Sequence, residues 1–315
     1  MRPARLRGGR PHVVSGARPA AMSYQPRRTA RHETLELSGL RHHLTRWGPP
    51  SANPFVFLHG WLDTSDTFQF VVDAFAAELP IVALDWRGFG RSAWQGRAYW
   101  FPDYLADLDA LLETVAPGAP VTLVGHSMGG NIACLYGGIR PERVRRVVSL
   151  EGFGLPRTKP EQAAGRYRKW LDELRAPPSF GTYESLERFT AVLMRKNPRL
   201  TPERAEFIAR SWSRPNGNGG LTVSADPAHK LVNPVLYHRE EAETVWGKVE
   251  APVLLVMGGR SEFAAHLGAD GSEAHFRTIF RTLTVATLPQ AGHMMHHEDP
   301  EAVAALIEPF IAESR

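Results

Sequence analysis

Short apolar runs alternate with helix-like stretches through the first half of the chain. Four short runs consist mostly of apolar residues, at 55–58, 81–84, 121–124 and 144–150. Such runs are typical of strands that are buried on both faces of a parallel sheet. Apolar positions at helical spacing follow the first three runs, at 68–79, at 104–115 and from Asn131 onwards. This alternation predicts an α/β fold, with a mostly parallel sheet covered by helices.

Three further patterns surround this predicted sheet. Residues 32–47 alternate apolar and polar positions around Ser38-Gly39, which predicts a β-hairpin. No strand-like run occurs from 155 to 249, where helical stretches lie at 161–175, 183–196, 202–213 and 235–246. The alternation then resumes, with strands at 252–257 and 283–288 and helices at 272–281 and 300–311. We therefore expect an α/β core formed by 32–154 and 250–315, with 155–249 inserted as a helical cap.

The first 31 residues differ in composition from the rest of the chain. They hold eight arginines and no Lys, Asp or Glu, and they show no periodicity, so we expect a disordered tail. The formal charge of +4 comes from this tail, because the remainder carries 29 basic and 33 acidic residues. No nucleic-acid partner is therefore expected for the body of the protein. The tail has no apolar core typical of a secretory signal, and we expect Met22 to be the natural start.

Hydrophobicity and cysteine content bear on the compartment. No apolar run approaches the ~20 residues that span a membrane, so no membrane partner is expected. The single cysteine, Cys134, excludes a disulfide framework within the chain and fits a reducing, cytoplasmic compartment. The sequence leaves the oligomeric state open.

The stretch 121–136 carries the strongest chemical signal. An apolar run leads into Gly125-His126-Ser127-Met128-Gly129, and an apolar helical pattern follows. A strand, Gly-x-Ser-x-Gly and a helix in this order are the context of a nucleophile elbow. In such a turn the serine has a strained backbone that exposes its hydroxyl, and the glycines have no Cβ where neighbouring backbone passes close.

Three more segments extend this signal. They are His59-Gly60-Trp61, the pattern Asp85-x-Arg87-Gly88-x-Gly90-x-Ser92, and Gly292-His293 followed by Glu298 and Pro300. Together with the elbow, and in this order, they resemble the α/β-hydrolase superfamily over about residues 33–313. Within it, the place of the cap and the stretch 150–156 look most like the serine hydrolase-like proteins, relatives of epoxide hydrolases and haloalkane dehalogenases. The resemblance implies an α/β-hydrolase fold and no cofactor.

The resemblance also implies the roles of four residues. Ser127 would be the nucleophile, and His293, on the loop after the last strand, would take its proton. The backbone N–H groups of Trp61 and Met128 would form the oxyanion hole. The expected reaction is cleavage of a small or medium carboxylic ester, a small-molecule substrate, through an acyl-enzyme intermediate. Thioesters, lactones and activated amides share this machinery.

The third catalytic residue departs from the commonest pattern of the family. The usual acid follows the strand at 252–257 as Gly-x-x-Asp, and here Ser261 stands at that spacing from Gly258. A shift by one residue offers Glu262. The alternative is Glu151, directly after the strand at 144–150, where several dehalogenase-like relatives carry their acid. We favour Glu151, because it needs no gap and because a carboxylate buried at a strand end is costly without a partner.

Other polar residues in these segments have structural interpretations. Those expected to brace loops or fix turns by hydrogen bonds are His59, Asp85, Arg87 and Ser92. His126 is expected to pack or to orient its neighbours, and not to act as the base. His296 and His297 lie close to His293 in the chain, but they form no i, i+4 pair and no Asp or Cys cluster accompanies them, so no metal is expected.

The predicted cap is rich in aromatic residues. They are Trp170, Phe180, Tyr183, Phe189, Trp212, Tyr237 and Trp246. Individually they suit core packing, and as a group they favour an apolar pocket over Ser127.

Other functions stay open at this point. Epoxide hydrolases and dehalogenases need an Asp at the nucleophile position, because a serine would form a stable ether, so Ser127 counts against both. A C–C bond hydrolase of a diketone ring-fission product would use the same three residue types. The remaining alternative is a non-catalytic, ligand-binding member of the fold.

Overall fold

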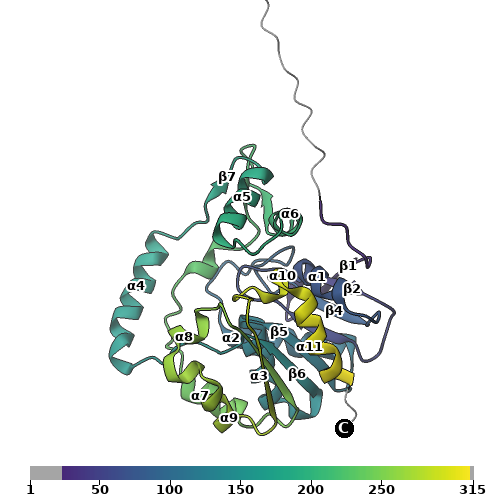
Figure 1. The fold of residues 1–315 in the computed structure, drawn as a ribbon. Helices are drawn as coiled ribbons and strands as arrows, with labels where there is room; N and C mark the ends of the chain where they lie inside the picture. Colours follow the sequence, from purple (N-terminus) through teal and green to yellow (C-terminus); the bar gives the residue numbers. More distant parts are fainter. Residues whose placement is uncertain (1–22, 313–315) are drawn as a thin grey trace, which may run out of the picture.

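The computed structural model describes residues 23–312, which are built around an eight-stranded sheet (Figure 1). Its strand order is β1-β2-β4-β3-β5-β6-β10-β11. β2 pairs antiparallel with both β1 and β4, and the other five pairings are parallel. The strands are β1 Arg31–Leu37, β2 Leu40–Trp47, β3 Phe55–Leu58, β4 Ile81–Leu84, β5 Val121–His126, β6 Val144–Leu150, β10 Val253–Gly258 and β11 Leu283–Leu288. The predicted mostly parallel sheet is thereby confirmed.

Helices cover both faces of this sheet, because its strands carry apolar side chains on both. In β3, Val56 and Leu58 join one apolar cluster, and Phe57 joins the other. Helices α2, α3, α7 and α9 close the first cluster, and α1 and α11 close the second. Their bounds are α1 Gln69–Ala74, α2 Phe101–Val115, α3 Met128–Ile139, α7 Arg239–Trp246, α9 Glu273–Ile279 and α11 Pro300–Ala312. Two short helices, α8 Phe263–His266 and α10 Met295–Glu298, lie in the loops after β10 and β11.

The expectation of disorder is wrong for residues 23–31. The guanidinium of Arg28 donates to the backbone oxygens of Val72 and Phe75, at the C-terminal end of α1. The backbone N–H of Arg28 donates to Asp73 at 2.8 Å. Carbonyl groups at a helix C-terminus have no intrahelical partner and attract a cation, so this arginine-rich segment docks there. The rest of the expected tail, including Met22, lies outside the described residues.

The segment 155–249, which we expected to be an inserted helical cap, contains more than helices. Its first three helices are α4 Ala163–Arg175, α5 Leu186–Lys196 and α6 Pro202–Ser211. It also holds a small sheet that the sequence pattern did not predict, formed by β7 Thr182–Tyr183, β8 Ser213–Pro215 and β9 Leu221–Val223. No residue of α4 is buried, whereas α7, the last helix of the segment, packs on α3 within the core layer. The division of the chain into a core and a separate cap stays a prediction.

The carboxyl ends of the parallel strands bring the sequence motifs together. His59 follows β3, Asp85 follows β4, Ser127 follows β5 and Glu151 follows β6. In an open parallel sheet these ends share one edge, which is where α/β proteins bind their ligands. Segments far apart in the chain therefore become neighbours at this edge.

The helices also bear on the question of a membrane partner. Within residues 23–312, no helix is both long and apolar enough to cross a bilayer. The cytoplasmic location and the absence of a membrane or nucleic-acid partner stay predictions.

Candidate active site

Ser127 lies at the sharp turn between β5 and α3. Its φ of 50° is in the left-handed region, which few side-chain-bearing residues adopt without strain. The two glycines of the motif are required by close packing. A Cβ on Gly125 would lie 2.4 Å from the backbone of Gly129, and a Cβ on Gly129 would lie 2.1 Å from the carbonyl oxygen of Leu58. The turn therefore has the geometry that the Gly-x-Ser-x-Gly pattern predicts.

A chain of hydrogen bonds runs from Ser127 through His293 to Glu151. The Nε2 atom of His293 lies 3.0 Å from Oγ of Ser127, and its Nδ1 atom lies 2.7 Å from Oε2 of Glu151. Glu151 directly follows β6 and is fully buried, while His293 lies on the loop after β11. Because Nδ1 donates to the carboxylate, Nε2 is left to accept the serine proton. The structure thus brings together the residues predicted as nucleophile, base and acid.

The carboxylate of Glu151 is held by two further donors. The backbone N–H of Gly258 donates to Oε1 at 2.7 Å, and the hydroxyl of Ser261 donates to Oε2 at 2.6 Å. Ser261 occupies the position where the family pattern usually has its acid, so in this chain that position supports a carboxylate from another strand. Glu262 is exposed at the start of α8 and makes no hydrogen bond with His293 among the described residues. The structure does not bring Glu262 into the chain of hydrogen bonds.

The loop after β3 packs directly against the Ser127 turn. A Cβ on Gly60 would lie 2.7 Å from Nδ1 of His126 and 3.2 Å from Cβ of Ser127, so this approach requires a glycine. The next residue, Trp61, lines the same cavity as Met128. Met128 is also the first residue of α3, where backbone N–H groups have no intrahelical partner. Both residues predicted to supply oxyanion donors therefore border Ser127.

His59 and Asp85 brace the loops around this site, in agreement with the sequence prediction. Nδ1 of His59 donates to the carbonyl oxygen of Gly60 at 2.7 Å, and Nε2 accepts from the backbone N–H of Trp86 at 3.0 Å. Burial lowers the pKa of His59, which favours the neutral ring that this pattern needs. Asp85 accepts a hydrogen bond from His43 at 3.1 Å. Burial alone would raise the pKa of Asp85, but the hydrogen bond and charge of His43 hold it at about 2.

Arg87 and Ser92 fix the turn after β4, as predicted. Nε and Nη2 of Arg87 donate to the two carboxylate oxygens of Asp107, which forms a bidentate ion pair. The hydroxyl of Ser92 donates to the carbonyl oxygen of Asp85 at 2.6 Å and accepts from the backbone N–H of His43 at 2.9 Å. Both side chains thus shape the loop and do not line the cavity over Ser127.

His126 forms a hydrogen bond to the backbone of the loop that carries His293. Its Nε2 atom donates to the carbonyl oxygen of His293 at 2.8 Å, and its ring lies 4.1 Å from that of His296 between centroids. Burial, together with the neighbouring histidines, lowers the pKa of His126 well below its usual value. A neutral His126 therefore braces the loop, in line with the orienting role that the sequence predicts.

Asp63 is a buried residue near this site that the sequence analysis missed. Nε2 of His296 donates to Asp63 at 2.9 Å, and Nε2 of His297 lies 3.4 Å from the same oxygen. These three side chains place possible metal-ligand atoms within 4.8 Å of one another. The other oxygen of Asp63 accepts from Trp212 at 2.8 Å and Thr67 at 2.7 Å, so hydrogen bonds already satisfy the carboxylate. The pairing joins residues 233 positions apart, so no local pattern could have found it.

A cavity of about 560 Å³ lies over Ser127. Its aromatic wall residues are Trp61, Tyr99, Trp100, Phe101, Tyr104, Phe153 and Phe263. None of the cap aromatic residues predicted to line the pocket does so. Phe189 packs in a separate apolar cluster with Phe70, and Trp246 is buried in the core. The expectation was wrong because the cap aromatic residues pack elsewhere: Tyr183 and Trp212 lie in the same cluster as Phe189, and Phe180 and Tyr237 pack with the core.

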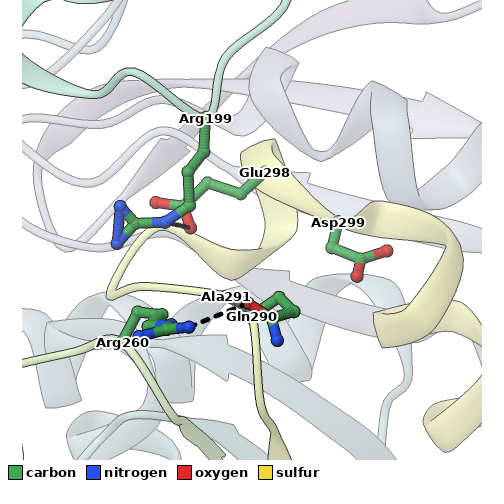
Figure 2. A pocket seen from close by; sticks show the side chains of 6 residues that line it. All are labelled: Arg199, Arg260, Gln290, Ala291, Glu298 and Asp299. Atoms are coloured by element: carbon green, nitrogen blue, oxygen red, sulfur yellow. Dashed lines mark hydrogen bonds and ion pairs between the residues drawn. The ribbon is translucent and has the colours of Figure 1, made fainter.

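A second hollow, of about 490 Å³, lies beside the His293 loop (Figure 2). Glu298, in its wall, accepts a hydrogen bond from the backbone N–H of Gly292 and pairs with Arg199 at 3.1 Å. Ser127 does not line this hollow. Glu298 thus connects the second hollow to the catalytic residues, because it accepts a hydrogen bond from Gly292, the residue before His293.

Comparison with known families agrees with this fold. The family model described as the alpha/beta hydrolase fold matches residues 53–300. The matched span contains every strand from β3 to β11, together with Ser127, Glu151 and His293. The chain therefore belongs to the alpha/beta hydrolase fold family, and the resemblance inferred from its motifs is confirmed.

Individual relatives are consistent with this assignment. The serine hydrolase-like protein of Danio rerio is 28% identical over 276 residues, which cover 84% of this chain and 83% of that protein. Epoxide hydrolase 4 of Mus musculus is 25% identical over 295 residues, which cover 88% of this chain and 77% of that protein. The crystal structure of a hypothetical protein from Pseudomonas aeruginosa PAO1 is 27% identical, with a TM-score of 0.78, and covers 90% of this chain and 99% of that one. The chain is accordingly a hydrolase of the α/β fold.

Proposed function

We propose that this protein is a serine hydrolase that cleaves a small or medium carboxylic ester through an acyl-enzyme intermediate. The observation that carries the proposal is the chain of hydrogen bonds from Ser127 through His293 to Glu151. A serine with this environment is activated by a neighbouring base, and the base is oriented by a buried carboxylate. The cavity over Ser127 supplies the space for a substrate.

Acylation involves Ser127, His293 and Glu151 together. Oγ of Ser127 attacks the ester carbonyl carbon while Nε2 of His293 takes the hydroxyl proton. Glu151 stabilises the imidazolium through the hydrogen bond to Nδ1. The backbone N–H groups of Trp61 and Met128 are the candidate donors to the oxyanion of the tetrahedral intermediate. The intermediate then expels the alcohol oxygen, which receives the proton from Nε2, and the alcohol leaves.

Deacylation repeats these steps with water in place of the serine. Nε2 of His293 takes a proton from water, and the oxygen of that water attacks the acyl carbon. The second tetrahedral intermediate releases Oγ of Ser127, which recovers the proton from Nε2. The net reaction consumes one ester and one water and yields one alcohol and one carboxylic acid.

The identity of the nucleophile argues against epoxide hydrolysis, although one relative carries that name. An aspartate nucleophile would form an alkyl ester that water can cleave. Ser127 would form an ether, which the same site has no means to cleave. An acyl group on Ser127, by contrast, is an ester and turns over.

The cavity supports a substrate of small or medium size. Its volume of about 560 Å³ is within the ~300–1,000 Å³ range of small-molecule sites. Most of its wall is aromatic or aliphatic, which suits an apolar acyl or alcohol part.

A rate survey on p-nitrophenyl esters of increasing acyl length tests the proposal. We expect turnover that peaks at one acyl length and is lost in Ser127→Ala. A fluorophosphonate probe should label the wild-type protein and not the variant, which reports activation of Ser127 even if none of these esters fits the cavity. Turnover near the wild-type level in Ser127→Ala would refute the proposed mechanism. So would a folded wild-type protein that neither cleaves these esters nor reacts with the probe.

A further inference from the structure

Arg166, on α4, brings a permanent positive charge to the wall of the cavity over Ser127. Its Nε atom donates to the carbonyl oxygen of Asn233 at 2.6 Å, which fixes the orientation of the guanidinium. Among the described residues, no carboxylate pairs with Arg166, and its two Nη atoms make no hydrogen bond. The side chain is half-buried and forms part of the cavity wall.

Two other arginines, Arg157 and Arg239, have carboxylate partners. Arg157 pairs with Glu240 at 2.6 Å and with Asp270 at 2.8 Å. Arg239, which is fully buried, pairs with Glu243 at 2.7 Å. Burying a charge is costly without a partner, and these arginines meet that requirement within the protein. Arg166 differs because it lines the cavity and pairs with no carboxylate among the described residues.

No other fixed positive charge lines this cavity in the part of the chain that the structure describes. His229 and His126 are in the wall, but burial lowers the pKa of His229 to about 3 and that of His126 well below its usual value. Both rings are therefore neutral near pH 7. Glu151, the carboxylate in the wall, is already engaged by His293 and Ser261. An anion in the cavity would thus find one cation available, Arg166.

We propose that the ester substrate carries a carboxylate, which Arg166 binds through its two Nη groups. An apolar or aromatic part of the substrate lies against Tyr99, Trp100 and Phe101 in the cavity wall. A guanidinium can bind a carboxylate through two parallel N–H···O bonds, a geometry that an ammonium cannot offer. This inference rests on the proposed function and names the class of its substrate.

The test compares esters that differ only by a terminal carboxylate. On the acyl side, p-nitrophenyl hemiadipate is paired with p-nitrophenyl hexanoate. On the alcohol side, 4-acetoxybenzoate is paired with 4-methylphenyl acetate. We expect the wild-type kcat/KM to be at least tenfold higher for the carboxylate member of one pair. The ratio of kcat/KM for the carboxylate ester to kcat/KM for its uncharged partner should fall at least tenfold in Arg166→Gln and should fall less in Arg166→Lys. In Arg168→Gln, an exposed control on the same helix, this ratio should not change.

Two results would overturn the inference and leave the proposed function standing. One is equal kcat/KM for both members of each pair in the wild type, and the other is a preference that survives in Arg166→Gln. If the wild type cleaves no ester, calorimetry on the Ser127→Ala protein separates the two proposals. If Ser127→Ala binds p-nitrophenyl hemiadipate more tightly than p-nitrophenyl hexanoate, and the double variant with Arg166→Gln does not, the carboxylate site is supported without turnover. Equal binding of the two esters would overturn it.

Discussion

Replacing Glu151 by glutamine removes one charge and almost no volume from the site. Oε2 of the buried carboxylate faces two donors, from His293 and Ser261, and Oε1 faces the N–H of Gly258. A glutamine has one acceptor oxygen, so its NH₂ group meets a donor in either orientation. If the NH₂ group faces His293, the ring must carry its proton on Nε2, toward Ser127. In that tautomer it cannot accept the serine proton.

The size of the effect follows from the imidazolium that forms during the reaction. Nδ1 of His293 and Oε2 of Glu151 are 2.7 Å apart. Their charge centres are then about 4 Å apart, where the attraction is about 4 kcal/mol at an effective dielectric constant of about 20. Since about 1.4 kcal/mol corresponds to a factor of ten in rate, kcat should fall about 10³-fold. Ser261→Ala removes one hydrogen bond to the same carboxylate, worth about 1.5–3 kcal/mol at most, and should reduce kcat about 10- to 100-fold.

The assay is the steady-state hydrolysis of the best p-nitrophenyl ester, with kcat and KM measured separately. KM should change little in Glu151→Gln, because the lost interaction strengthens only as the imidazolium forms. Glu262→Gln is the matched control, since it removes an exposed carboxylate from the neighbouring loop, and its kcat should stay within about twofold of the wild type. A thermal melt checks that each variant is folded. A kcat for Glu151→Gln within tenfold of the wild type, or a larger loss in Glu262→Gln, would refute the reasoning.

Three further expectations concern stability. Gly129→Ala places a Cβ 2.1 Å from the carbonyl oxygen of Leu58 and should lower the free energy of urea unfolding by about 3 kcal/mol or more. Gly165→Ala, on α4, meets nothing within 4 Å and should raise that free energy by about 0.5–1 kcal/mol. Similar values for the two variants would contradict the packing argument. Arg28→Ala loses the hydrogen bonds to the end of α1 and should destabilise by about 1–3 kcal/mol, measured in the same way, and no change would mean that the docked segment contributes nothing. The pKa of Asp85 is about 2 in the folded state, against an ordinary value of 3.8. The ionised carboxylate therefore stabilises the fold by about 2 kcal/mol above about pH 4, and this contribution is lost as pH falls toward 2. Asp85→Asn should therefore lose less stability than the wild type between pH 4 and pH 2, and equal losses would show that Asp85 is not the titrating group.

Most of the central sheet could be predicted from short stretches of sequence. The strands 55–58, 81–84, 144–150 and 283–288 have the same bounds in the structure as in the apolar pattern. A strand covered on both faces needs consecutive apolar residues, so its signal is local and clear. The small sheet of β7, β8 and β9 has strands of two or three residues, which are too short to show any period. Its existence depends on pairing between segments that are distant in the chain.

The choice between Glu151 and Glu262 could not be settled from the chain alone. Each follows a strand of the parallel sheet, and β6 and β10 are neighbours in it, so both positions are near His293. Which carboxylate meets Nδ1 depends on the backbone after each strand. Glu151 has a φ of 54°, and its carboxylate meets Gly258 and Ser261, whereas Glu262 immediately precedes α8 and is exposed.

The sequence by itself determined the α/β fold and the turn at Ser127, because both depend on the sterics of adjacent residues. Only the tertiary structure decided what surrounds that turn. It placed Asp63 against His296 on the His293 loop and brought Arg166 to the cavity. It also formed the aromatic wall from residues 99–104 together with Trp61, Phe153 and Phe263, and not from the aromatic residues of the predicted cap. These contacts join residues that are tens to hundreds of positions apart, and they depend on how whole helices and loops pack. A pattern that compares neighbouring residues has no access to such contacts, because they depend on residues far apart in the chain.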